Sequence, residues 1–282
     1  MDGHPPQPDL SKRRAGPLLA IAGILLAGAG AAYWWLGWTA SPPPAAEPPP
    51  EPSQPVTPPE PPPEPVASAT VAEAAAVDPD ALLRKVAERG SASPLLHGWL
   101  DAQGLLRRFA AAVHQISQGR SPRQVLGFIS IPGRFEVIES WDPAAQARLP
   151  DGATPGEDRI YVDPASYHRY DGVAGVFRDA DVEAWAAGYR RLSPYLERVY
   201  AEVAAPGERF DHALARALDR IRGVTLPTGA VELVEKGALF QYADPKLEGL
   251  DEVSKHLLRM GPDNAGAIQT AAARFMKAAR LQ

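Results

Sequence analysis

The side chains in this sequence that could bind a charged ligand are tyrosines and arginines that lie close together along the chain. The planar guanidinium of arginine matches a carboxylate or a phosphate, and tyrosine suits interfaces and stacking against sugars. The alternative is a purely structural role, in which these tyrosines pack in the core and these arginines pair with aspartates. For a ligand site we select Arg169, Tyr170 and Arg259. The whole set is Arg108, Tyr167, Arg169, Tyr170, Tyr189, Arg190, Arg191 and Arg259.

Motifs for metal binding are missing. No two of the histidines have the i, i+4 spacing of a helical zinc site, and there is no HExxH. We therefore expect surface or capping histidines and no metal site. The histidines are His4, His97, His114, His168, His212 and His256.

Motifs for cofactor binding and for nucleophilic catalysis are missing too. There is no GxSxG, no SxxK and no phosphate-binding loop, so we expect no cofactor. Asp179, Asp181 and Glu183 suggest a calcium loop, but the glycine and the last glutamate are absent. We interpret them as favourable charge at a helix start. A pair of carboxylates could still hydrolyse a glycan, but the sequence does not identify such a pair.

The elements that must position these side chains are mostly helices. Asp78-Pro79 resembles an N-cap followed by proline at the first helical position, with Gly90 as the end. In the best apolar stripe, which Ser193-Pro194 interrupts, we expect a kink or two helices. Gly261-Pro262 predicts one helix end directly before another start. Apolar stripes predict helices over 105–116, 182–203, 210–221, 250–260 and 268–279.

The sequence patterns that predict strands cover only short segments. Four segments rich in β-branched or aromatic residues predict strands at 128–131, 135–140, 159–162 and 231–234. Pro132-Gly133 could close a small hairpin, and 141–158 is expected to be a loop. The expected fold of 78–282 is therefore mainly α (α+β), a helical bundle-like domain with a small β-hairpin or short sheet.

The N-terminal region predicts a membrane anchor. Leu18 to Trp38 is uncharged and, as a helix, roughly 30 Å long, about the thickness of a hydrocarbon core. The basic cluster Lys12-Arg13-Arg14 places residues 1–16 in the cytoplasm and makes 17–38 the transmembrane helix. The alternative is a cleaved signal peptide with Gly30-Ala31-Ala32 as its cleavage site. The anchor residues are Leu18, Ile21, Ile24, Leu25, Leu26 and the aromatic belt Tyr33, Trp34, Trp35 and Trp38.

Small residues also line one face of the predicted anchor. Gly23, Ala27 and Ala31 lie four residues apart, and small residues allow helices in lipid to approach closely. We expect a weak homodimer of the anchor through this face. The alternative is that Gly and Ala are simply frequent in this segment.

Residues 39–77 predict a disordered stalk. Between Pro42 and Pro65 there are 14 prolines, separated mainly by Glu, Ala, Ser and Thr. Proline lacks an N–H and fixes φ, so a semi-rigid polyproline II spacer is expected. The remaining residues, 78–282, carry 26 basic and 27 acidic groups and so have no strong field for nucleic acid. The chain has no cysteine, which excludes disulfides and thiolate chemistry.

Five local patterns resemble those of one known family. They are Arg108-Phe109, Tyr167 to Asp171, Tyr189-Arg190-Arg191 with Pro194-Tyr195, Tyr242 to Pro245 and, most specifically, Leu257 to Ala265. Together they are similar to an uncharacterised bacterial envelope family, domain of unknown function 3014, over roughly residues 80–280. The resemblance implies an anchor in the bacterial inner membrane and a domain in the periplasm. It implies no activity and no site residue.

We therefore expect a single-pass envelope protein without catalytic activity. Its helical periplasmic domain would bind a protein or a cell-wall component, and its anchor would contact membrane lipid. The alternative is an envelope hydrolase without a linear motif. An energy-transducing protein would share the anchor and the spacer, but its terminal domain is usually smaller and richer in strand.

The anchor yields a test of topology. A reporter that is active only outside the cytoplasm, fused after Gln282, should be active, and the purified protein should begin near Met1. An N-terminus at Tyr33 would instead establish signal cleavage.

Overall fold

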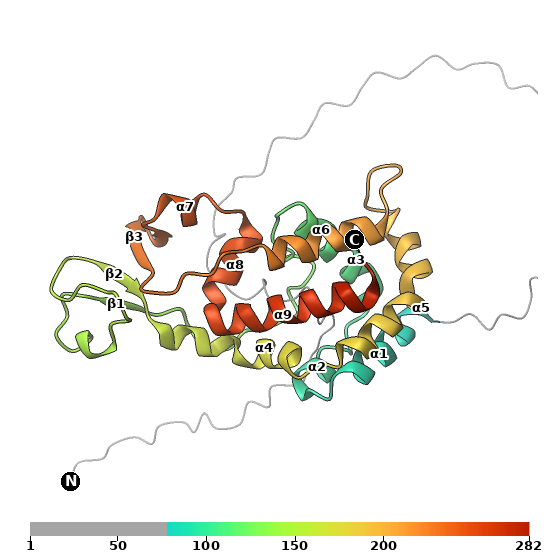
Figure 1. Ribbon diagram of the computed structural model, residues 1–282, viewed down its shortest axis with the longest axis horizontal. Helices are drawn as coiled ribbons and strands as arrows, with labels where there is room; N and C mark the ends of the chain where they lie inside the picture. The colour runs from blue at the N-terminus through green and yellow to red at the C-terminus, as the bar shows by residue number, and fades with distance from the viewer. Residues whose placement is uncertain (1–77, 282) are drawn as a thin grey trace, which may run out of the picture.

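The structure, a computed structural model, describes residues 78–281. The predicted tail (1–16), transmembrane helix (17–38), dimer face and stalk (39–77) lie outside these residues. Within the described part, the chain is rich in helix and has a small antiparallel sheet, which confirms the predicted α+β class. Figure 1 shows the sheet at one end of the long axis and most of the helices at the other.

The elements follow one another without a repeat. The helices are α1 (Pro79–Gly90), α2 (Pro94–His97), α3 (Leu105–Ser117), η1 (Gln146–Arg148), η2 (Pro164–Tyr170), α4 (Asp171–Arg178), α5 (Val182–Tyr200), α6 (Phe210–Arg222), α7 (Pro245–Glu248), α8 (Glu252–Met260) and α9 (Pro262–Ala279), where η marks a 3₁₀ helix. The strands are β1 (Val137–Glu139), β2 (Ile160–Val162), β3 (Glu232–Lys236) and β4 (Leu239–Tyr242), paired antiparallel in the order β1-β2-β3-β4.

Aspartates determine where several of these helices begin. In each case the carboxylate accepts a hydrogen bond from a backbone N–H in the first turn, which would otherwise lack a partner. Asp78 accepts from Asp80 at 3.0 Å and Asp181 from Ala184 at 2.9 Å, as the charge pattern predicts. Asp163, Asp244 and Asp251 do the same for η2, α7 and α8.

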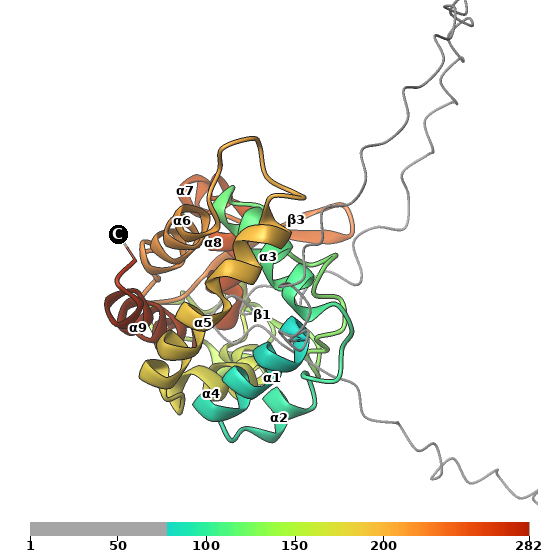
Figure 2. The ribbon, with the colours of Figure 1, turned by 90° about the vertical axis from the view of Figure 1, so that its right-hand side faces the viewer.

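Helix α5 lies at the centre of the helical body, in contact with α1, α3, α6 and α9 (Figure 2). Its contact with α1 depends on two glycines. A Cβ atom at Gly188 would lie 2.2 Å from Val86, and one at Gly90 would lie 2.1 Å from Trp185. The two helices therefore approach more closely than any larger residue would allow.

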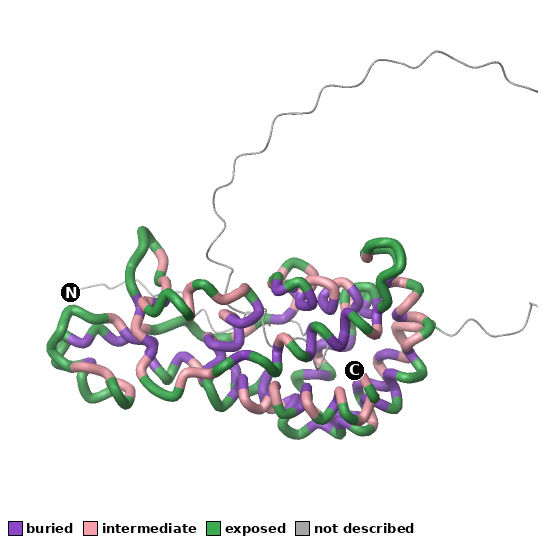
Figure 3. The backbone as a smooth tube through the Cα atoms, turned by 45° about the horizontal axis from the view of Figure 1, so that its top comes forward, coloured by how far each residue is buried: buried purple, intermediate pink, exposed green. Residues whose placement is uncertain are grey.

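Helix α9 is the other central element. It packs against α4, α5, α6 and α8, and Ile268, Ala272 and Phe275 on its predicted apolar face are all buried. Figure 3 shows buried backbone throughout the helical body, whereas the loops at the sheet end are mostly exposed. No helix within residues 78–281 combines the length and the apolar character needed to cross a membrane.

The sheet is buried on both sides near its middle. Leu233 pairs with Tyr242, and both contact the helical body. On the other side Ile138 and Tyr161 are buried, and the Tyr161 hydroxyl accepts a hydrogen bond from Thr154 in the predicted loop 141–158. The loop therefore covers the side of the sheet that the helices leave open.

Two of the predicted strands are wrong or too long. Residues 128–131 form turns and irregular backbone, and 135–140 is a strand only at Val137–Glu139. Backbone bonds from Leu126 to Pro122 and from Ile129 to Leu126 build successive turns that bury the apolar side chains without a partner strand. Periodicity cannot separate these outcomes in so short an apolar run.

The topology around these strands also differs from the prediction. Pro132-Gly133 closes no hairpin, because β1 pairs with β2 across the loop 141–158. Strand β4 was not predicted, although it follows a turn at Gly237, whose φ is +64°. Neither η2 nor α4 was predicted, and α5 continues through Pro194 as one helix.

The close contact of α1 and α5 yields a test with a matched control. Gly188→Ala should lower the free energy of unfolding by about 1–3 kcal/mol, because the methyl group overpacks the contact with Val86. Gly175→Ala in α4 should leave stability unchanged or raise it by up to about 1 kcal/mol, because nothing lies within 4 Å of the added atom. Urea unfolding measures both. A Gly188→Ala protein as stable as the Gly175→Ala protein would contradict the close approach.

Candidate functional site

The structure brings together the three residues that the sequence selects. Arg169 and Tyr170 end η2, and Arg259 lies in α8. The Arg169 guanidinium carbon is 4.8 Å from the centre of the Tyr170 ring. Burial raises the pKa of Tyr170, while the charges of Arg169 and Arg259 oppose that rise, so both cations lie near the phenol. Because burial prevails, Tyr170 is a neutral hydrogen-bond donor at neutral pH.

Two chain corners hold these residues in place. One is the junction of η2 with α4, and the other is the junction of α8 with α9. The buried Asn264 amide donates to the Tyr167 carbonyl at 3.0 Å and to an Asp171 carboxylate oxygen at 2.9 Å. It also lies 3.2 Å from the Met260 carbonyl. One side chain therefore joins the segment of Arg169 to the segment of Arg259.

Gly261 allows the second corner to fit against the first. Its φ is +81°, in the region that favours glycine, and an added Cβ would lie 2.4 Å from the Tyr167 ring. The glycine of the most specific family-like pattern is thus needed for its backbone conformation and for the space it leaves to Tyr167.

Two further tyrosines complete the site. Burial raises the pKa of Tyr167, and it raises that of Tyr242 to about 12 even though Arg259 opposes the change. Tyr242 ends β4, so sheet, η2 and α8 all contribute to one group of side chains. We name Tyr167, Arg169, Tyr170, Tyr242 and Arg259 the tyrosine–arginine cluster.

The two arginines of the cluster are half-buried and have no acidic partner among the described residues. Within residues 78–281, no carboxylate oxygen lies within 4.0 Å of Arg169 or Arg259. Nε and Nη2 of Arg169 are covered by protein atoms and have no acceptor. A buried charged donor without an acceptor is costly. An anion reaches these covered donors only if a neighbouring side chain moves aside, and it would then supply the missing acceptor.

Arg108, Tyr189 and Arg190 lie outside the cluster, and the two arginines bond to backbone carbonyls and not to aspartates. Arg108 donates to the carbonyls of Gln103 and Val125 and so supports a loop. The Tyr189 hydroxyl donates to Asp211, and Arg190 donates to the carbonyl of Ala278. The contacts of Tyr189 and Arg190 join α5 to α6 and α9.

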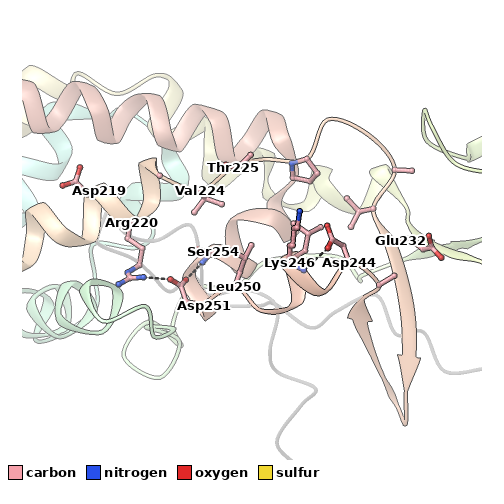
Figure 4. A pocket seen from close by; sticks show the side chains of 16 residues that line it. Asp219, Arg220, Val224, Thr225, Glu232, Asp244, Lys246, Leu250, Asp251 and Ser254 are labelled. Atoms are coloured by element: carbon pink, nitrogen blue, oxygen red, sulfur yellow. Dashed lines mark hydrogen bonds and ion pairs between the residues drawn. The ribbon is translucent and has the colours of Figure 1, made fainter.

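A cavity of about 1000 Å³ lies between the end of α6, the start of β3 and helices α7 and α8 (Figure 4). Val224 and Leu250 line it, together with the ion pair Arg220–Asp251. Burial raises the pKa of Asp251, but hydrogen bonds from Ser254 and Arg220 outweigh it, and the net shift is downward. The cavity contains no residue of the cluster, and no sequence motif predicted it.

The prediction that each histidine is a surface or capping residue is wrong for His256. This side chain is 4% exposed, and its Nε2 lies 2.8 Å from the Ser121 hydroxyl. Burial, together with the charges of Arg259 and Arg123, lowers its pKa to about 3. The nearby Glu252 accepts from the backbone N–H of Ser121. A histidine with so low a pKa is a poor base near neutral pH, so the contact with Ser121 is structural.

Within the described residues, no group of three or more histidine, aspartate or glutamate side chains is arranged to hold a metal ion. Asp181 is a helix cap, as expected from its position, and Glu183 pairs with Arg274 at 3.2 Å on the surface.

The α+β architecture and the joined corners define a helical domain with an arginine-rich polar cluster. A family model described as "Protein of unknown function (DUF3014)" matches residues 105–276, which is more than half of the chain. The chain belongs to this family. Searches of curated proteins and of solved structures found no match.

The buried histidine yields a prediction about acid stability. The pKa of His256 falls from 6.5 to about 3 on folding, so the unfolded chain binds this proton more readily below pH 6.5. The stability that depends on neutral His256 is full above about pH 6.5 and is lost as the pH falls towards 3. His256→Gln should therefore flatten the fall in urea midpoint between these values. A variant with the same pH profile as the original protein would show that other groups control acid unfolding.

Proposed function

We propose that this protein is a non-enzymatic binding module whose tyrosine–arginine cluster recognises an anionic group on a partner. The single observation that carries the proposal is Arg169, whose Nε and Nη2 are buried without an acceptor. Arg259 adds a second positive charge near Tyr170, and neither arginine pairs with a carboxylate of the described chain. Two guanidinium groups and neutral phenols suit a carboxylate or a phosphate.

The protonation states of the cluster favour binding over catalysis. The pKa values of Tyr167, Tyr170 and Tyr242 all rise on folding, so the phenols keep their protons at neutral pH. General acid–base catalysis needs a group that gains and loses a proton near the working pH. The cluster lacks such a group, so a hydrolase has no specific support from it.

The proposed setting is the bacterial envelope. The basic cluster before the apolar run 18–38 and the stalk support a single-pass anchor in the inner membrane with the domain in the periplasm. There the partner would be a protein or a cell-wall component that carries carboxylates or phosphates. The anchor would hold the domain near the membrane, and the stalk would set its reach.

The experiment measures stabilisation of the full-length protein in detergent by phosphate and by citrate, against sodium chloride at equal ionic strength. Either probe anion should raise the melting temperature, because it binds only the folded form. Arg169→Met should weaken this effect by at least about tenfold in concentration, since hydrogen bonds to charged groups contribute about 1.5–3 kcal/mol. Arg169→Lys should retain only part of it, because the planar fork is lost.

The matched control is Arg134→Met, which removes the same charge from an exposed position next to Phe135. It should respond to both anions like the original protein. The proposal is wrong if neither anion stabilises more than chloride does. It is also wrong if Arg169→Met and Arg134→Met respond alike. Circular dichroism of each variant establishes that the fold is intact.

A further inference from the structure

Two exposed aromatic rings lie beside the cluster. Phe135 and Phe240 are 36% and 37% exposed, and their ring centres are 6.3 Å apart. The guanidinium carbon of Arg169 lies 5.6 Å from the centre of the Phe135 ring. We name Phe135, Phe240 and Arg169 the aromatic patch. It combines two partly exposed rings with a half-buried cation, two of whose donors are covered by protein and have no acceptor.

Hydrogen bonds of the fold position the patch, although its two rings come from distant parts of the chain. Phe135 precedes β1 and Phe240 lies in β4, which are the opposite edges of the sheet. The backbone of Glu136 is held by Ser166, whose hydroxyl accepts from its N–H at 2.7 Å and donates to its carbonyl at 3.0 Å. This pair of bonds ties the segment before β1 to η2 and places Phe135 next to Arg169.

The charge of the patch is positive once its surroundings are included. The exposed neighbours Arg134 and Glu136 offset each other, and so do Glu235 and Lys236 near Phe240. Arg169 remains without a carboxylate partner in the described chain, and the charge of Arg259 also acts on Tyr170. An occupant should therefore be apolar, able to lie on aromatic rings, and negatively charged.

One segment of this chain has that chemistry. Residues 42–65 contain 14 prolines and four glutamates, Glu47, Glu51, Glu60 and Glu64, and no basic residue. Proline-rich segments dock on aromatic surfaces and lose little entropy in doing so, since their extended form is preorganised. We propose that the proline–glutamate segment 42–65 of this chain docks on its own aromatic patch, with a glutamate at Arg169.

The connection is long enough for this contact. Figure 1 places α1, where the described chain begins, at the opposite end of the molecule from the sheet, so the segment must turn back along the body. The 26 residues from Pro52 to Val77, directly before Asp78, reach about 80 Å if extended. A domain of this size has a radius of gyration of about 17 Å. The first part of the segment, which includes Glu47 and Glu51, therefore reaches the patch.

Tethering makes even a weak contact sufficient. A tethered segment that can span the distance is present at an effective concentration of up to about millimolar near its own domain. A millimolar dissociation constant would then leave a large fraction of the patch occupied. An anionic partner would have to displace the segment, so the stalk would act as a competing internal ligand. This inference rests on the proposed function, because both use Arg169.

Photo-crosslinking in the full-length, membrane-bound protein tests the docking. The photoreactive amino acid p-benzoylphenylalanine replaces Phe240, and the matched control replaces Val203, which is 44% exposed in the loop after α5. After irradiation, mass spectrometry should find crosslinks from position 240 to residues 42–65 of the same chain and none from position 203. Changing the four glutamates to glutamine should lower the yield about fivefold.

Isotope labelling identifies the source of the segment. In a mixture of light and heavy chains, crosslinks within one isotope confirm the contact inside one chain, whereas mixed crosslinks overturn it in favour of a second copy. No crosslink to 42–65, an equal yield from position 203, or an unchanged yield in the glutamine variant also overturns it.

If the segment is not captured but phosphate or citrate still stabilises through Arg169, the docking fails and the proposed function stands. If neither anion acts, the proposed function fails.

Discussion

The contact between two chain corners is the constraint on which the candidate site depends. Asn264 is buried, and its single amide nitrogen bonds acceptors from both the η2–α4 corner and the α8–α9 corner. Without a partner, that amide would carry the full cost of desolvation, so the corners are fixed relative to each other. Arg169, Tyr170 and Arg259 come from segments about 90 residues apart, and they meet because this contact is made. Gly261 supplies the space for it.

The helical body and the polar cluster are stabilised in different ways. In the body, glycines at the α1–α5 contact and small residues of α9 allow close packing, and the gain is apolar burial. At the cluster, burial keeps the phenols neutral, whereas Arg169 keeps its charge with two donors unpaired. Buried polar groups without a partner are rare in folded proteins, so the two donors of Arg169 need an explanation, and a bound anion is one.

Much of the helical structure could be predicted from the sequence, because its signals are local. Asp78 and Asp181 as helix caps, the apolar stripe of α5 and the Gly261-Pro262 boundary all follow from short-range rules. The candidate residues Arg169, Tyr170 and Arg259 were also selected from residue type and motif. Their mutual contact was not foreseen, because nothing local records that Asn264 bonds to the Tyr167 carbonyl.

The strands were harder to predict for a physical reason. Those of this sheet are three to five residues long, too short for alternation to give a clear signal. Residues 128–131 have the composition of a strand, but they form turns and irregular backbone in which only Ile129 is buried, and η2 lies in a segment without an apolar stripe. His256 resembled the other histidines in sequence, and only the packing of α8 buries it.

The position of α9 has a consequence for the order of events during synthesis. This helix is the last element of the described chain, yet it fills the space between α4, α5, α6 and α8. Every earlier helix can form while the chain is still growing, but the core cannot close until Phe275 has been added. The apolar faces of the earlier helices that α9 covers therefore stay exposed on the nascent chain until α9 has been made. Folding of this domain therefore cannot be completed until α9 has been made, and until then α4, α5, α6 and α8 lack the helix that packs against all four of them.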